Sequence, residues 1–299
     1  MKMIKQVALQ ITDQDYQLSK SRIVGKDLLF SSDSDFYKAL SDGFFLLEIP
    51  NHIEVLPGLN LCHNFYKDND GHNDSYKGFK KHQSLYFDRP NFQTEHILTD
   101  QQTRKEFFPT EVKQLADKMN NLAIIILENV LKKLNVPEKD WDLVTGHCVQ
   151  NKGTHWFACS HYRSEIQKPG CPTHQDTGFV TVLYIDEPGL QAYINKKWEN
   201  INPVPGYFII NFGRSFEILT EKLPVCVKSV LHRVSQTYKV NGKKDRVSMA
   251  AFTNMPNDLC LYQYSSNKIL SVYQTVEEFL QEFNKTTWDD HYTDFGLTS

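Results

Sequence analysis

The sequence predicts an α+β fold in which a core of short strands, arranged as a sandwich or jelly roll, is flanked by helices. Two observations lead to this prediction. From about Thr145 onward, short apolar runs alternate with turns rich in Gly, Pro and Asn, as is typical of β-sandwiches and jelly rolls. Ahead of them, apolar residues recur at three- and four-residue steps between Pro109 and Leu134, which indicates a long amphipathic helix.

The N-terminal region begins with a predicted helix followed by a buried strand. Ser34 or Asp35 could cap the helix and Gly43 could end it, and FFLLEIP (residues 44–50) then forms the strand. The polar segment 66–100 is rich in Asn, Asp, His and Gly. We expect a long loop with short elements there, which is where lids that contact substrates often lie.

The strand-rich part of the chain contains seven predicted strands. Gly, Pro and Asn residues between them fit hairpin and corner turns. A last helix is predicted from Thr275, because Glu278 three residues later completes a capping box. The predicted strands are TGHCV (145–149), HWFACSHY (155–162), FVTVLYI (179–185), LQAYI (190–194), YFIINF (207–212), SVLHRVS (229–235) and RVSMAAFT (246–253).

A single domain is expected over residues 1–299, because the chain shows no internal repeat and no low-complexity linker. Within it, residues 1–140 are predicted to be mainly helical, with loops on the substrate side. Residues 141–262 are predicted to form the metal-binding jelly-roll core, and residues 263–299 a C-terminal helical segment.

The composition is that of an ordinary globular protein, with 40% hydrophobic and 23% charged residues. A net charge of -3 gives no reason to expect nucleic acid or a membrane surface as a partner. The chain has no long uncharged apolar run and no clear signal peptide, so we expect a cytoplasmic protein, and we expect it to be a monomer. Its 6 cysteines include no CxxC pair and fit reduced thiols.

The residues that carry the most chemistry are His174, Asp176 and His232. Residues two apart in an extended segment point to the same side, so His174 and Asp176 can aim at one point, and intervening strands could return His232 beside them. Two imidazoles and one carboxylate leave several metal positions open, as in the non-haem Fe(II) oxygenases. Iron is inferred from this geometry, since binding strength alone would favour copper or zinc. The His–x–Asp triplet alone could equally belong to a solvated loop.

Arg246 and Ser248 share one face of a later predicted strand. A guanidinium fork and a hydroxyl together make a good clamp for a carboxylate. They could hold the far carboxylate of a dicarboxylic acid whose other end chelates the metal, as 2-oxoglutarate would, leaving one position for dioxygen. Alternatively, Arg246 could form a structural ion pair with Asp245 or Glu187.

Several blocks of sequence resemble the isopenicillin-N-synthase-like family of Fe(II)- and 2-oxoglutarate-dependent oxygenases, over most of the chain. The blocks are GFFLLEIPNH, CPTHQDTGFVTVLYIDEPGLQAYINKKWENINPVPGYFIINFG, LHRV and RVSMAAF. The resemblance implies a double-stranded β-helix, or jelly roll, with His174, Asp176 and His232 as iron ligands. It also implies that Arg246 and Ser248 bind the C5 carboxylate of 2-oxoglutarate, and that Tyr162 is a further contact of this co-substrate.

Two stretches depart from the family pattern. Ser160 stands where members often carry Asn, two residues before Tyr162. The usual YPPCP is replaced by HYRSEIQKPGCP, an insertion that could reshape the entrance to the site. The family motifs are specific for the reaction type and say little about the substrate.

Candidate substrate-binding residues are Tyr76, His82 and Arg89 in the polar segment, with Phe252 as apolar lining around the site. For each polar residue, an ordinary place on a surface loop is an equally reasonable interpretation.

The function predicted from these residues is that of an Fe(II)- and 2-oxoglutarate-dependent oxygenase. It would use dioxygen to oxidise an unactivated C–H bond of a small molecule in specialised metabolism, by hydroxylation, desaturation or ring closure. One alternative is an iron oxidase of the same fold without 2-oxoglutarate, in which Arg246 and Ser248 hold a substrate carboxylate. Another is a non-catalytic binding protein on this scaffold.

Overall fold

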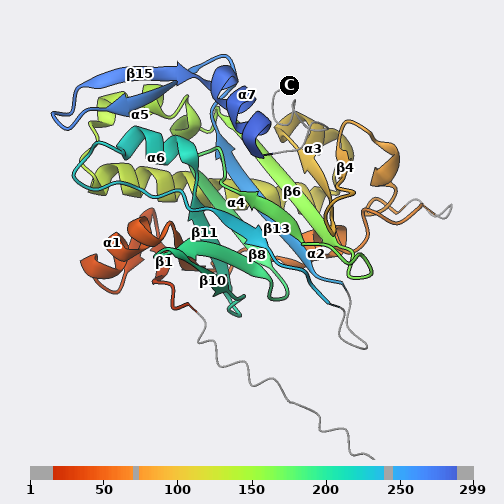
Figure 1. Cartoon of the computed structure of the whole chain (residues 1–299). Coiled ribbons are helices and arrows are strands. Elements are labelled where there is room, and N and C mark those ends of the chain that lie inside the picture. Colours follow the sequence, from red (N-terminus) through yellow and green to blue (C-terminus); the bar gives the residue numbers. More distant parts are fainter. Residues whose placement is uncertain (1–15, 70–73, 239–244, 288–299) are drawn as a thin grey trace, which may run out of the picture.

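Two sheets packed face to face form the centre of the protein (Figure 1). The computed structural model describes residues 16–69, 74–238 and 245–287. Its larger sheet consists, in spatial order, of β2 (Asp27–Phe30), β1 (Lys20–Val24), β3 (Phe44–Glu48), β11 (Tyr207–Phe212), β8 (Val180–Ile185), β13 (Val247–Asn254), β6 (Thr154–Tyr162), β5 (Thr94–Thr99) and β4 (Tyr86–Asp88). The smaller sheet consists of β10 (Lys197–Ile201), β9 (Leu190–Ile194), β12 (His232–Val234) and β7 (Cys171–His174).

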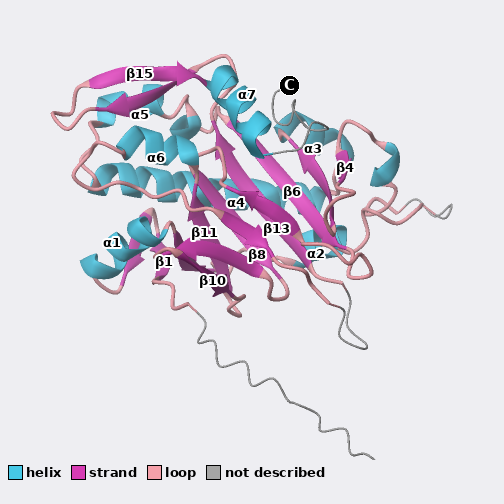
Figure 2. Ribbon diagram, in the orientation of Figure 1, coloured by secondary structure: helices cyan, strands magenta, loops and turns pink. Residues whose placement is uncertain are grey.

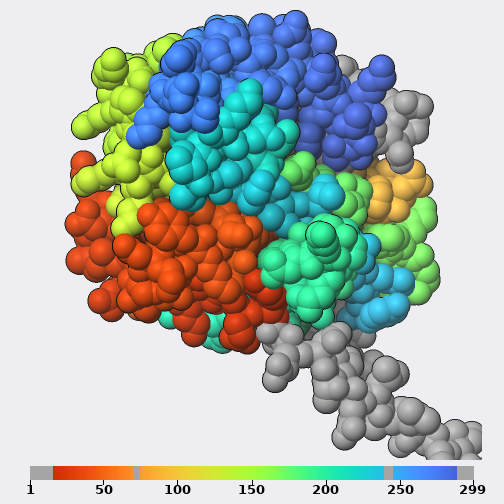
Figure 3. Space-filling view, turned by 60° about the vertical axis from the view of Figure 1, so that its left-hand side comes forward, coloured from red at the N-terminus to blue at the C-terminus, as the bar shows by residue number. Residues whose placement is uncertain are grey.

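The helices pack mainly against the larger sheet (Figure 2). The hairpin of β14 (Cys260–Tyr264) and β15 (Leu270–Thr275) packs over α6, and its blue surface adjoins the cyan surface of α6 in Figure 3. No helix within the described ranges combines the length and the apolar character needed to cross a membrane. The helices are α1 (Asp33–Asp42), α2 (Leu56–Cys62), α3 (Gln101–Phe107), α4 (Thr110–Lys133), α5 (Glu138–Val144), α6 (Arg214–Thr220) and α7 (Val276–Thr287), with short 3-10 turns η1 (Phe79–Lys81) and η2 (Cys148–Gln150).

The larger sheet buries both of its faces, because successive side chains of a strand point to opposite sides. On one side, Phe157 of β6 and Met249 of β13 belong to the main core, which includes the apolar stripe of α4. On the other side, Phe44 of β3 and Ile209 of β11 pack with Ala192 of the smaller sheet. This two-layer arrangement with flanking helices confirms the predicted α+β jelly roll.

The predicted helix and strand near the N-terminus are present, and the helix begins slightly earlier than expected. Ser32, rather than Ser34 or Asp35, caps α1: its hydroxyl accepts a hydrogen bond of 3.1 Å from the backbone N–H of Asp35. Gly43 ends the helix with a φ of 71°, in the left-handed region that favours glycine. The chain then runs directly into β3.

The two other predicted helices are confirmed. α4 occupies almost the whole segment between Pro109 and Leu134. At the start of α7, the hydroxyl of Thr275 accepts a hydrogen bond of 3.2 Å from the backbone N–H of Glu278. The Glu278 carboxylate accepts one of 3.2 Å from the backbone N–H of Thr275, which completes the capping box.

One predicted strand, TGHCV, is wrong. The Thr145 hydroxyl donates a hydrogen bond of 2.7 Å to the Trp141 carbonyl of α5, so this segment closes a helix end. Gly146 and His147 follow with φ angles of 54° and 65°, which a strand cannot accommodate. The chain continues into η2 and joins the sheet only at β6.

The N-terminal region contributes more to the sheet than its predicted, mainly helical character suggests. Strands β1 to β5 all belong to the larger sheet. The polar segment 66–100 contains β4 and β5, and β5 is buried along its whole length against β6. A segment predicted as a surface loop therefore forms part of the wall of the core.

A buried charged cluster on the helix side of β5 and β6 makes the stability of the protein depend on pH. The Glu95 carboxylate lies 2.9 Å from a ring nitrogen of His161 and 3.1 Å from the Lys80 ammonium, and it accepts a hydrogen bond from the Tyr86 hydroxyl. Burial by itself would raise the pKa of Glu95, but these partners outweigh it and lower the pKa to about 2.

Replacing Glu95 with Gln is expected to lower the free energy of unfolding at neutral pH by on the order of 2 kcal/mol. Since the folded-state pKa lies below the ordinary value of 4.5, the contribution is complete above that pH and is lost as pH falls toward about 2. Urea unfolding at several pH values should show the gap between wild type and E95Q closing on acidification. The exposed Glu106→Gln serves as the control, and a pH-independent gap would contradict the expectation.

Candidate functional site

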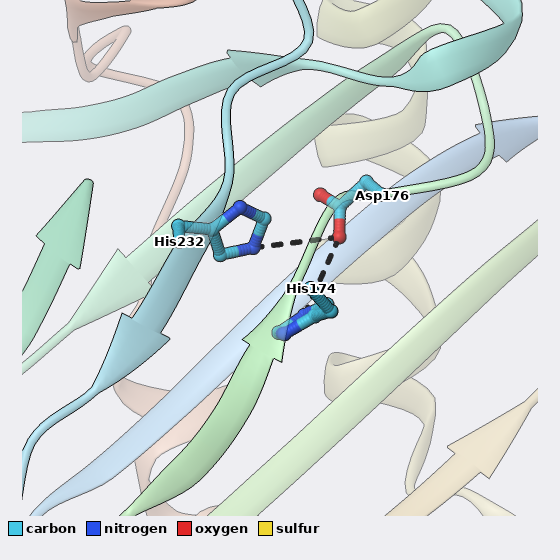
Figure 4. A group of neighbouring side chains, drawn as sticks. All are labelled: His174, Asp176 and His232. Atoms are coloured by element: carbon cyan, nitrogen blue, oxygen red, sulfur yellow. Dashed lines mark ion pairs between the residues drawn. The ribbon is translucent and has the colours of Figure 1, made fainter. Parts of the chain in front are cut away.

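The three candidate metal ligands come together at the edge of the smaller sheet (Figure 4). His174 is the last residue of β7 and His232 the first of β12, and the two are direct partners across this antiparallel pair. Asp176 follows β7 in a loop. Its Oδ1 lies 3.9 Å from Nε2 of His174 and 3.7 Å from Nε2 of His232. One atom from each residue could therefore bind the same ion.

Both imidazole rings are oriented by the backbone. Nδ1 of His174 lies 2.9 Å from the Pro172 carbonyl and Nδ1 of His232 lies 3.1 Å from the Val230 carbonyl. Since a carbonyl can only accept, each Nδ1 carries the proton and each Nε2 presents a lone pair. Burial, followed by the charge of His232, lowers the pKa of His174 to about 4. A neutral ring with a free Nε2 is the form that binds a metal.

Asp176 is held in its charged form with one oxygen facing the histidines. Its Oδ2 accepts a 2.5 Å hydrogen bond from the Thr181 hydroxyl and a 2.6 Å bond from the Asn211 side-chain amide. Burial would raise the pKa of Asp176, but the two histidines and these two hydrogen bonds lower it overall. Because both hydrogen bonds go to Oδ2, Oδ1 can bind a cation.

Thr181 and Asn211, which hold the Asp176 carboxylate, were not predicted as site residues from the sequence. Both are polar residues inside the otherwise apolar strands β8 and β11. This interruption of the apolar pattern could have indicated them. Groups that orient a metal-binding carboxylate affect metal affinity strongly.

The loop that carries Asp176 is fixed by close packing of two glycines. The backbone N–H of Arg214 donates to the Asp176 carbonyl at 2.7 Å. A Cβ on Gly213 would lie 2.2 Å from the Gly178 carbonyl oxygen, and one on Gly178 would lie 2.4 Å from the Thr253 carbonyl oxygen. Any larger residue at either position would push the loop, and Asp176 with it, away from the histidines.

Replacing Asn211 with Ala is expected to weaken metal binding by about 10- to 100-fold, because Asp176 loses a donor that orients it. Titration of the purified variant with Fe(II) under anaerobic conditions would measure this. Asn129→Ala removes an amide that makes comparable hydrogen bonds on α4 and should leave metal affinity unchanged. Equal affinities for N211A and wild type would contradict the role given to this amide.

Arg246, Ser248 and Tyr162 form a second polar group. The Arg246 guanidinium lies 4.3 Å from the centre of the Tyr162 ring, and the Tyr162 hydroxyl lies 3.3 Å from the Ser248 hydroxyl. Nε of Arg246 donates a hydrogen bond of 3.1 Å to the backbone carbonyl of Glu187. Nη1 is buried with no hydrogen-bond partner among the described residues. A buried guanidinium with an unused N–H is suited to bind a carboxylate.

A cavity of about 170 Å³ lies beside the candidate ligands. Its wall is the face of β5, β6 and β13 that points away from the main core, together with the Asp176 loop and the inner face of α7. The lining residues include Arg89, Thr94, His96, Leu98, Trp156, Ala158, Ser160, Tyr162, Cys171, His174, Asp176, Phe252, Val276, Phe279, Leu280 and Phe283.

Two of the four candidate substrate-binding residues, Arg89 and Phe252, line this cavity. The other two do not line it. Tyr76 packs against the main core, and the ring of His82 packs against Phe107 with ring centres 4.9 Å apart. His96 and Trp156, by contrast, line the cavity and were not singled out from the sequence.

Comparisons with known proteins agree with this geometry. Residues 142–255 match the family model described as the 2OG-Fe(II) oxygenase superfamily. The chain is similar to Protein DMR6-LIKE OXYGENASE 2 of Arabidopsis thaliana, with 39% identity over 143 residues, covering 46% of this chain and 38% of that protein. It is also similar to Jasmonate-induced oxygenase 2 of Arabidopsis thaliana, with 38% identity over 162 residues, covering 51% of this chain and 41% of that protein.

The chain therefore spans less than half of the length of these curated relatives. Among solved structures, the fold is similar to that of JOX2 in complex with 2OG, Fe and JA. The TM-score is 0.64 at 19% identity, covering 84% of this chain and 80% of that one. This likeness covers most of both chains and supports the jelly-roll architecture.

Proposed function

We propose that this chain, which belongs to the 2OG-Fe(II) oxygenase superfamily, is an Fe(II)- and 2-oxoglutarate-dependent oxygenase that uses dioxygen to oxidise an unactivated C–H bond of a small molecule. The observation that carries the proposal is the combination of two buried sites. One offers two imidazole nitrogens and a carboxylate oxygen at a single point. The other offers a buried guanidinium with an unused N–H.

His174, Asp176 and His232 are proposed to hold Fe(II), for which this donor set is suited. A bound iron would supply the oxidising chemistry from dioxygen and 2-oxoglutarate, which no side chain of the protein can provide. The protein's own part is to fix the two rings by their Nδ1 hydrogen bonds and the carboxylate by Thr181 and Asn211.

Arg246, Ser248 and Tyr162 are proposed to bind the far carboxylate of 2-oxoglutarate. The unused Nη1 of Arg246 and the hydroxyls of Ser248 and Tyr162 provide donors for a carboxylate. The stacking of the guanidinium on the Tyr162 ring and its bond to the Glu187 carbonyl keep it in one orientation. The fixed guanidinium would therefore also fix the orientation of a carboxylate bound to it.

The apolar part of the cavity wall, including Leu98, Trp156 and Phe252, would exclude water and hold the substrate C–H bond close to the metal. Its volume of about 170 Å³ supports a small molecule as substrate. Whether the outcome is hydroxylation, desaturation or ring closure depends on how that molecule lies. The proposal includes a monomeric, cytoplasmic enzyme of specialised metabolism. The net charge of -3 supports the absence of a nucleic-acid partner.

The test is a turnover assay of the anaerobically reconstituted protein with Fe(II), 2-oxoglutarate, dioxygen and a metabolite panel. Succinate formed in proportion to substrate consumed is the expected result. Oxygen consumption and substrate oxidation that do not require 2-oxoglutarate would instead identify an iron oxidase. Retained iron without oxygen consumption for any compound would identify a binding protein.

A further inference from the structure

We propose that the substrate carries a carboxylate and that Arg89, with His96 beside it, binds that carboxylate at the cavity wall. The inference rests on the proposed function and adds the chemical class of the substrate. Arg89 follows directly after β4, and its side chain is only 5% exposed although it carries a full positive charge. Among the described lining residues of the cavity it is the one arginine or lysine.

A guanidinium at a cavity wall presents a fixed fork of N–H donors, which matches the two oxygens of a carboxylate. Because Arg89 is buried, this attraction is stronger than the same contact would be on the surface. Arg89 is a different residue from Arg246, which the proposed function assigns to the co-substrate, and Arg246 is not among the residues that line this cavity. The protein thus has one buried arginine for the co-substrate and another for the substrate.

His96 adds a neutral hydrogen-bonding group next to this charge. It lies on β5 directly across from Ser160 of β6, and both residues line the cavity. Its ring is stacked on that of Phe87, with ring centres 5.1 Å apart and planes 14° apart, so its orientation is fixed. Burial lowers the pKa of His96 well below its ordinary value, and the charge of Arg89 lowers it further. At neutral pH the ring is therefore uncharged and can donate one hydrogen bond to an anion.

The segment that carries Arg89 is held by the stretch that departs from the family pattern. Arg163 lies in that stretch, and its Nη2 forms an ion pair of 2.8 Å with Asp88. The same guanidinium donates to the backbone carbonyls of Arg89 at 3.4 Å and of Gln93 at 3.1 Å. Arg163 of the replacement HYRSEIQKPGCP thus contacts the Asp88 side chain just before Arg89 and the backbone at and after it, so it is a positioning residue for Arg89.

The rest of the wall defines the other end of the substrate. Leu98, Trp156 and Phe252 line the sheet side, and Phe279 and Leu280 of α7 line the opposite side. These apolar side chains would bind a hydrocarbon part next to the charged group. A cavity of about 150 Å³ can hold a benzene ring. The cavity here, at about 170 Å³, fits a small carboxylic acid with an aryl or short alkyl body.

The test compares acids with their uncharged amides, which have nearly the same shape. Phenylacetate, 3-phenylpropanoate and hexanoate, each with its amide, are titrated calorimetrically into the anaerobic Fe(II) protein at saturating 2-oxoglutarate, so that the co-substrate clamp is already filled. We expect at least one acid to bind at least about tenfold more tightly than its amide. Arg89→Gln should reduce this ratio to below about twofold, since the neutral side chain no longer distinguishes the pair.

Two further variants test whether Arg89→Gln acts only by disturbing the structure. Arg89→Lys keeps the charge and should retain part of the preference for acids. Lys81→Gln removes an exposed positive charge nearby in the chain and should keep the wild-type ratio. Equal binding of acids and amides by the wild type, or an unchanged ratio in R89Q, would overturn the inference.

The same preparations report separately on the proposed function. Iron content does not depend on the charge of the substrate, and neither does the slow conversion of 2-oxoglutarate to succinate that occurs without substrate once dioxygen is admitted. If both are normal while acids and amides bind alike, only the substrate class is wrong. If the protein neither retains iron nor forms succinate, the proposed function itself fails, and the inference with it.

Discussion

Asp176→Ala is expected to remove the metal from the protein and to lower turnover by at least about 100-fold. This effect is larger than that of losing a residue, such as Asn211, that only orients Asp176. Oδ1 of Asp176 is the one anionic donor of the site, 3.7 Å and 3.9 Å from the two histidine nitrogens. The variant would also leave the buried donors of Thr181 and Asn211 without an acceptor, at a cost of about 1–3 kcal/mol each. Metal content after dialysis and turnover under saturating iron measure the effect.

Asp176→Asn separates the two contributions. Its amide oxygen can still accept from Thr181 and Asn211, so its thermal stability should stay close to that of wild type. Its lack of charge should nevertheless prevent iron retention. Full activity in either variant would show that the metal is bound elsewhere.

Arg246→Ala should raise the 2-oxoglutarate concentration needed for half-maximal turnover by about 100-fold, while iron remains bound. The estimate corresponds to two charge-assisted hydrogen bonds of about 1.5 kcal/mol each. Succinate formation measured over a range of 2-oxoglutarate concentrations gives the shift, and metal analysis of the same sample shows that the ligands are intact. Arg246→Lys should recover only a small part, because an ammonium lacks the planar fork.

Arg22→Ala, which removes an exposed arginine from β1, is the matched control and should change neither quantity. A wild-type response to 2-oxoglutarate in R246A would place the co-substrate clamp elsewhere. It would then favour the interpretation of Arg246 as a structural residue that supports the Glu187 carbonyl.

The proximity of His174 and Asp176 could be predicted from the sequence because it depends only on local geometry. A two-residue step at the end of a strand sends both side chains toward one side, and β7 ends at His174 as that reasoning requires. No local pattern specifies that β12 pairs with β7: the sequence only allowed intervening strands to return His232 beside the other two residues, and the family resemblance implied it. The predicted helices around Leu115 and Phe279 likewise rest on local periodicity and capping.

The parts that could not be predicted depend on contacts between distant segments. β5 has no clean alternation of polar and apolar residues, because Glu95 is buried by its charged partners and His96 by the cavity wall. The role of Arg163 depends on its reach across to Asp88 and Gln93, which no spacing in the sequence indicates. TGHCV resembles a strand through Cys148 and Val149 at its end, but the preceding helix determines its conformation.

The candidate metal centre draws on both layers of the fold. His174 and His232 belong to the smaller sheet, whereas Thr181 and Asn211, which hold Asp176, belong to the larger one. An ion bound by the three ligands would therefore link the two layers. Each tenfold excess of free ion over its dissociation constant would add about 1.4 kcal/mol to the free energy of unfolding. In a cell short of iron, the protein would be unfolded and degraded more often, so its abundance would fall together with its activity.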